Sequence, residues 1–62
     1  MTFAEIIPPL INGIRLRRRT WFSWEYIQIA KDADGNSLLT IHTEIGTLSK
    51  RDIEADDWEI VK

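Results

Sequence analysis

The chain has 62 residues, with ten acidic and eight basic side chains, one histidine, no cysteine and a formal net charge of −2. These numbers indicate a single small domain over residues 1–62. They exclude disulfides, a thiolate metal site and a multi-histidine metal site within one chain. The acidic excess argues against a nucleic-acid partner, because such domains usually carry a basic excess.

Stability is the first problem for so short a chain, which buries a smaller fraction of its surface than a longer one. Large aromatic side chains and self-association are the remaining ways to stabilise it. Three tryptophans, two phenylalanines and one tyrosine supply the first. We therefore expect a homo-oligomer. No apolar stretch approaches the roughly 20 residues that span a bilayer, and the start MTFAEII lacks a basic leader, so we expect a cytoplasmic protein without a membrane partner.

The first residues predict a helix over 3–12. Thr2 to Glu5 reads T-x-x-E, the pattern of a capping box. Apolar residues then recur at spacings of three and four, which marks one face of a helix: Phe3, Ile6, Ile7, Leu10 and Ile11. Gly13 is a natural terminator. Because Pro8 and Pro9 lack an amide proton, we expect a kink or a split near residue 7.

Two strands are predicted next. Ile14, Leu16 and Arg18 would share one face of the first strand, with Arg15, Arg17 and Arg19 on the other. Residues 20–23 would connect it to a second strand over 24–30. Both faces of that second strand carry large apolar groups, which suggests a strand that is covered on both sides.

The segment 31–37, KDADGNS, predicts a hairpin turn, because Asp-Gly adopts positive φ readily. Its D-x-D-G start is similar to an EF-hand loop, but Thr43 stands where the bidentate glutamate should be, so we expect no metal site. A third strand over 38–43 would place His42 on a polar or edge face. No nucleophile accompanies His42, so we expect no catalytic role for it.

The C-terminal part predicts a short helical turn over 50–55, because Ser49 to Asp52 reads as a second capping arrangement. A last strand over 58–61 would place Trp58 and Ile60 on one face. The predicted fold class is therefore α+β, with an N-terminal helix packed on a small antiparallel sheet and a short helical turn before the last strand.

The charges are segregated along the chain. Four of the five arginines lie at Arg15, Arg17, Arg18 and Arg19, and five acids lie at Asp52, Glu54, Asp56, Asp57 and Glu59. One interpretation is that the two segments pair within one chain or between subunits. In this interpretation Arg18, on the face of Leu16, pairs with an acid near the rim of the core, and Arg17 and Arg19 stay free.

A second interpretation is a ligand site. No phosphate-binding glycine loop, nucleophile elbow or metal motif is present, and no carboxylate pair can be argued from spacing, so we expect no enzyme, no catalytic residues and no cofactor. A guanidinium, however, grips a phosphate through two hydrogen bonds, and an aromatic ring stacks on a nucleobase. The candidate ligand-binding residues are Arg17, Arg18, Arg19, Trp21 and Tyr26. Among the tryptophans Trp21 is the best candidate for a role outside the core, and we also expect it to close the edge of the core.

Several blocks together resemble the phage Thoeris anti-defence domain family: TFAEII..L..G at the start, LRRRTW at 16–21, EYIQI at 25–29 and LSKRDIEADDWEIV at 48–61. Arg17, Arg18 and Trp21 match its basic-strand motif. Asp57, Trp58 and Glu59 match its terminal motif. The chain is similar to the short members, because it lacks an insertion that longer members carry after the basic strand.

The resemblance implies a non-enzymatic sponge in the host-cell cytosol, which holds a cyclic ADP-ribose-type nucleotide signal between the subunits of a homo-oligomer. A relative in that family is an anti-CRISPR protein. The alternative is therefore a small protein-interaction module or an inhibitor of a host defence complex such as Cas9, with Trp21, Phe22 and Trp24 as interface anchors. An enclosed positive cleft between subunits would favour the sponge, and a flat exposed aromatic patch would favour the protein partner.

Overall fold

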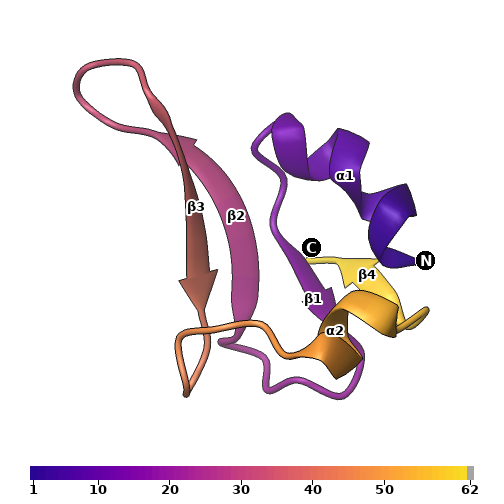
Figure 1. Cartoon of the computed structure of the whole chain (residues 1–62). Helices are drawn as coiled ribbons and strands as arrows, with labels where there is room; N and C mark the ends of the chain where they lie inside the picture. Colours follow the sequence, from indigo (N-terminus) through magenta and orange to yellow (C-terminus); the bar gives the residue numbers. More distant parts are fainter. Residues whose placement is uncertain (62) are drawn as a thin grey trace.

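An N-terminal helix lies against a four-stranded antiparallel sheet, and a short second helix precedes the last strand, which confirms the predicted α+β class. Figure 1 shows the computed structural model, which describes residues 1–61. The elements in chain order are α1 (Phe3–Ile11), β1 (Leu16–Arg18), β2 (Tyr26–Lys31), β3 (Ser37–His42), α2 (Lys50–Glu54) and β4 (Trp58–Ile60). The sheet order is β3-β2-β1-β4, so β3 and β4 form its two edges.

Capping boxes start both helices, as the sequence predicts. The amide of Glu5 donates to Thr2 Oγ1 at 3.2 Å, and the amide of Thr2 donates to Glu5 Oε1 at 2.9 Å. Helix α1 continues through Pro8 and Pro9 without a break, so the expected split near residue 7 is wrong. The two prolines remove amides that would otherwise bond to the carbonyls of Ala4 and Glu5, and both of those residues are exposed to water.

The strand register decides which side chains face the helices. Leu16 of β1 lies opposite Ile27 of β2 and Ile60 of β4, and Arg18 lies opposite Trp58. Directly opposite residues point to the same face of an antiparallel sheet. This face carries the helices and the core, whose buried side chains are Ile6, Leu10, Leu16, Ile27 and Trp58. We call it the covered face.

The other face, which we call the open face, carries the alternate residues, such as Arg17, Tyr26 and His42. No helix or strand among residues 1–61 packs on it, since both helices contact the covered face. The expectation that the second strand is covered on both sides is therefore wrong. Its apolar residues Ile27 and Ile29 belong to the covered face, and Tyr26 is an aromatic residue on the open face.

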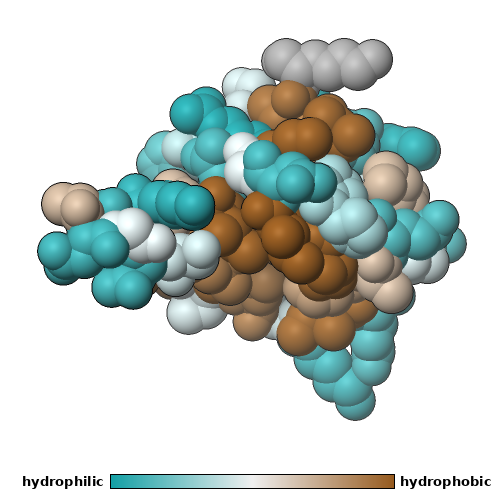
Figure 2. All heavy atoms as spheres, turned by 90° about the horizontal axis from the view of Figure 1, so that it is seen from above, coloured by the Kyte–Doolittle hydropathy of each residue, from teal (hydrophilic) through white to brown (hydrophobic). Residues whose placement is uncertain are grey.

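The strands are shorter than predicted where the chain enters or leaves the sheet. Strand β1 begins at Leu16 rather than Ile14, which is 38 % exposed, and β2 begins at Tyr26 rather than Trp24. The β2–β3 turn holds Gly35 at φ +83°, as Asp-Gly predicts. Figure 2 shows hydrophilic side chains where this hairpin ends and an apolar area across the middle of the molecule. Neither helix of the described part approaches the length and apolarity that a membrane span requires.

Candidate ligand-binding site on the open face

The arginine run meets the acidic C-terminal segment within one chain. Arg17 Nε donates to Glu59 Oε1 at 3.0 Å on the open face. Arg18, on the covered face, donates from Nη1 to Asp52 Oδ1 at 2.9 Å and from Nε to Asp57 Oδ1 at 2.8 Å. The interpretation that these segments pair is therefore confirmed, including the pairing of Arg18 near the core rim. The expectation that Arg17 stays free is wrong, because its Nε is bound to Glu59.

The contacts among Arg18, Asp52 and Asp57 favour the charged form of each group. Asp52 is 8 % exposed, and burial raises the pKa of its carboxyl, but hydrogen bonds from Ser49 and Arg18 outweigh this, so the pKa lies below its ordinary value. The hydrogen bond from Arg18 also lowers the pKa of Asp57. The same two carboxylates raise the pKa of Arg18. All three groups therefore stay ionised at neutral pH, and Arg18 is committed to its partners.

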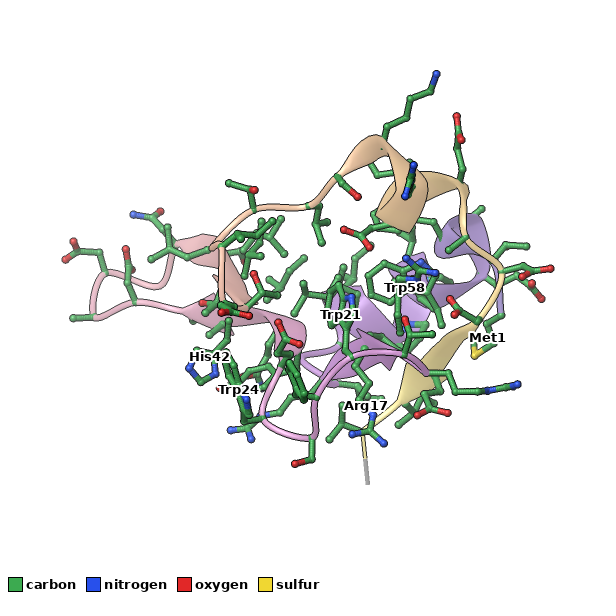
Figure 3. The ribbon with its side chains drawn as sticks, turned by 90° about the horizontal axis from the view of Figure 1, so that it is seen from below. Met1, Arg17, Trp21, Trp24, His42 and Trp58 are labelled. Carbon is green, nitrogen blue, oxygen red and sulfur yellow. The ribbon has the colours of Figure 1, made fainter. Side chains whose placement is uncertain are left out.

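Trp21 packs at the edge of the core. Its ring meets the buried Trp58 ring edge-on, with centroids 5.2 Å apart, and Figure 3 shows the two indoles side by side. Trp58 in turn donates from Nε1 to the carbonyl of Asp52 at 2.8 Å, which ties α2 to β4. The expectation that Trp21 closes the edge of the core is confirmed, and its candidacy for a role outside the core is wrong. Trp24, at 47 % exposed, is the tryptophan least involved in the core.

An aromatic cluster occupies the open face. It consists of Phe22, Trp24, Tyr26 and His42, together with Arg15. The rings of Phe22 and Trp24 are nearly parallel, at 5° and 6.4 Å between centroids. His42 meets Trp24 at 5.8 Å and Tyr26 at 4.9 Å, both edge-on. The guanidinium carbon of Arg15 lies 4.5 Å from the centre of the Tyr26 ring, a cation–π geometry. Figure 3 shows Trp24 beside His42.

Glu25 holds the loop that carries this cluster. It is 9 % exposed, and its two carboxylate oxygens accept from different loops. Oε1 accepts from the amide of Phe22 at 3.0 Å, and Oε2 accepts from the amide of Glu44 at 3.1 Å. Both oxygens are thereby satisfied by backbone groups. One buried carboxylate thus fixes the loop of residues 22–25 against the segment that follows β3, and the exposed rings of Phe22 and Trp24 are presented from a braced backbone.

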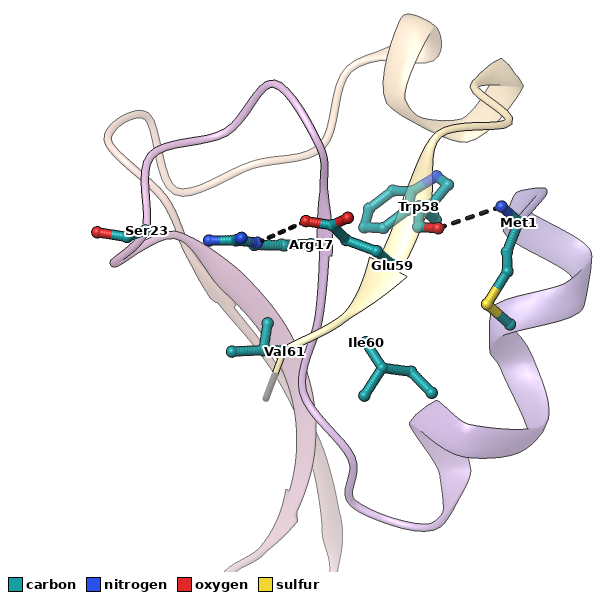
Figure 4. Close-up of a pocket in the computed structure, with 7 residues that line it drawn as sticks. All are labelled: Met1, Arg17, Ser23, Trp58, Glu59, Ile60 and Val61. Carbon is teal, nitrogen blue, oxygen red and sulfur yellow. Dashed lines mark hydrogen bonds and ion pairs between the residues drawn. The ribbon is translucent and has the colours of Figure 1, made fainter.

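A depression of about 650 Å³ adjoins the cluster along β4. Its lining residues are Met1, Arg17, Ser23, Trp58, Glu59, Ile60 and Val61. Figure 4 shows the Arg17–Glu59 pair and Ser23 among the residues that line it. Because the register places Arg17 beside Tyr26, a ligand on the aromatic cluster could reach this depression. Among residues 1–61, no group of three potential metal-ligating side chains converges.

The structure therefore divides the five sequence-predicted residues. Arg17 and Tyr26 share the open face, Arg19 is exposed beyond the end of β1, and Arg18 and Trp21 belong to the covered side. Sequence reasoning missed Arg15, Trp24 and His42 as members of one cluster. The two-residue alternation of Arg15 with Arg17 and of Trp24 with Tyr26 was a signal for the first two, but the nearness of His42 depends on the β2–β3 register, in which it lies opposite Tyr26. The chain matches no family model, no curated protein and no solved structure.

Proposed function

We propose that the protein is a non-enzymatic binding domain that sequesters a small anionic, aromatic ligand of the cyclic nucleotide class on the open face of its sheet. The observation that carries this proposal is the aromatic cluster on the open face, with the guanidinium of Arg15 against its Tyr26 ring. An exposed indole offers a stacking surface for a nucleobase, worth about 1–3 kcal/mol per base. Sequestration requires no catalytic group, only a surface that binds the ligand unchanged.

The roles follow from the geometry. Trp24 and Phe22 stack on the base, because their side chains are 47 % and 64 % exposed. Tyr26 forms the wall behind it. Arg15, which lies against the Tyr26 ring, binds phosphate oxygens, and Arg17, which lines the depression, joins it while Glu59 holds its Nε. Arg19, exposed just after β1, is a further candidate for phosphate. Arg18 and Trp21 are left out of the site, since both are engaged inside the fold.

Isothermal titration calorimetry with cyclic ADP-ribose isomers and cyclic dinucleotides tests the proposal. We expect micromolar or tighter binding, with the ligand recovered unchanged by chromatography. Trp24→Ala should weaken binding by at least about fivefold, since one stacked base is worth about 1–3 kcal/mol. Ile53→Ala is the matched control, because Ile53 is also half-exposed, at 52 %, and lies on α2. Absence of heat with every nucleotide would reject the proposal.

A protein partner is the second candidate, and the shape of the site favours it. Phe22 and Trp24 stand on an open surface rather than inside an enclosed cavity, and aromatic and arginine side chains are enriched at the centres of protein interfaces. If no nucleotide binds, the partner would be a host defence protein. A pull-down from host extract with the wild type, compared with Trp24→Ala, tests this: a protein retained only by the wild type supports it.

A further inference from the structure

The two edges of the sheet differ in whether another backbone segment covers them. The outer edge of β4 is occupied by the first residue of the chain, since Trp58 donates its amide to the carbonyl of Met1 at 3.1 Å and the Met1 amino group donates to the carbonyl of Trp58 at 3.1 Å. Among the described residues 1–61, Figure 1 shows no helix or strand along the outer edge of β3. Strand β3 is six residues long, and every residue except Ile41 is exposed. A long uncovered edge presents unpaired backbone groups to any strand that can join it.

Strand β3 carries none of the features that protect an edge. Its sequence SLLTIH contains no proline, lysine, arginine or acidic residue, although these are the residues that natural sheets use to block edge pairing. Leu38 and Leu39 are 54 % and 52 % exposed, one on each face, and Ile45 just beyond the strand is 72 % exposed. A second copy of this strand would meet no like charge. The edge is therefore both hydrogen-bonding and apolar.

The hairpin geometry fixes which groups point outward. Asp32 donates to the carbonyl of Asn36 at 2.9 Å, and hydrogen-bonded pairs alternate along an antiparallel ladder. Thr40 therefore bonds to Gln28 of β2, its register partner. Leu39 and Ile41 direct their amides and carbonyls away from β2, toward the free edge.

We propose that β3 pairs with β3 of a second copy, antiparallel and with Thr40 on the twofold axis, to form a continuous eight-stranded sheet. Because this twofold axis is perpendicular to the sheet, the covered faces of both copies lie on the same side of the continuous sheet. Leu39 then lies opposite Ile41 of the second copy, twice, and these two pairs exchange four backbone hydrogen bonds. On the open face Thr40 meets its own copy, a favourable cross-strand pair.

The second copy also completes the open face. In this register His42 lies opposite Leu38 of the second copy, so an apolar side chain from the other subunit flanks the aromatic cluster of the first. The two clusters lie on the same side of the continuous sheet, on either side of the axis. The assembly does not depend on the ligand proposed above, and it is measured without any ligand.

Sedimentation velocity of the purified protein gives the first test. We expect the wild type at twice the chain mass of 7.3 kDa and Leu39→Lys at the single-chain mass. The matched control is Ile53→Lys, with the same charge change at a residue that is also 52 % exposed, and it should remain a dimer. A monomeric wild type, or a wild-type assembly that Leu39→Lys leaves intact, would overturn the proposal.

A second test probes the register of the two strands, and it is informative even if the Leu39→Lys variant does not fold. The chain contains no cysteine, so Thr40→Cys introduces a single thiol at the axis. Cα atoms of a non-hydrogen-bonded pair lie about 4.5 Å apart, within the range of a disulfide. Mild oxidation should convert Thr40→Cys to a covalent dimer. Leu38→Cys, two residues along the same face, should stay uncrosslinked. Equal crosslinking of both variants, or none of Thr40→Cys, would contradict the Thr40 axis.

Discussion

Replacing Arg18 by alanine tests whether this arginine stabilises the fold or binds a ligand. The sequence places Arg18 in a basic motif that the resemblance associates with a ligand. In the structure it instead joins β1 to α2 through Asp52 and to the segment before β4 through Asp57. We therefore expect Arg18→Ala to lower the free energy of unfolding.

The magnitude follows from the Arg18–Asp52 pair. Removing one partner of a buried pair costs about 3–5 kcal/mol, and a hydrogen bond to a charged group contributes about 1.5–3 kcal/mol. The side chains here are 21 % and 11 % exposed, and Ser49 still donates to Asp52, so the smaller of these two costs applies. We expect a loss of about 2 kcal/mol, which lowers the melting temperature by about 10 °C for a domain of this size.

Urea unfolding followed by tryptophan fluorescence measures this loss, because Trp21 and Trp58 lie at and in the core. Arg19→Ala is the control, since it removes the same charge from an exposed neighbour and should change the stability by no more than about 0.5 kcal/mol. Equal unfolding midpoints for the two variants would refute the structural role of Arg18. If Arg18→Ala then also abolished nucleotide binding, the assignment from the basic motif would be the correct one.

Three further predictions concern the fold. Trp58→Phe should lower the free energy of unfolding, measured by urea titration, by about 2 kcal/mol, because it removes the hydrogen bond to Asp52 at 2.8 Å and leaves a void in the core. An unchanged unfolding midpoint would contradict the tie between α2 and β4. Gly13→Ala should lose about 1 kcal/mol, because φ is +83° at the end of α1, whereas Asn12→Ala, beside it at ordinary φ, should lose less. Stability should fall as the pH drops below about 4, because Asp52 and Asp57 have lowered pKa values in the folded state, so the unfolded chain takes up protons first; this fall should be shallower in Arg18→Ala, and an equal slope would argue against the cluster.

Local patterns carried much of the prediction. The T-x-x-E and S-x-x-D capping boxes, the apolar spacing of α1 and the Asp-Gly turn each depend on residues within a few positions, and each is present in the structure. The split expected near residue 7 was wrong because the effect of the two prolines depends on whether Ala4 and Glu5 can turn their carbonyls to water. Whether they can do so depends on where the helix lies, and in the structure both residues are exposed to water.

The alternation of β1 also separated Arg17 from Arg18 on the sequence alone, because a strand points successive side chains to opposite faces. What each arginine does was decided by the register with β4, which sets Glu59 opposite Arg17, and by α2, which brings Asp52 to Arg18. The tertiary structure also decided that Trp21 packs at the edge of the core and that Trp24 lies outside it. Both indoles are apolar and close in sequence, and only the path of the chain around Glu25 directs one to Trp58 and the other to His42. Sequence thus determined the elements and their two faces, whereas the packing of distant segments decided which charges are neutralised and which aromatic rings remain exposed.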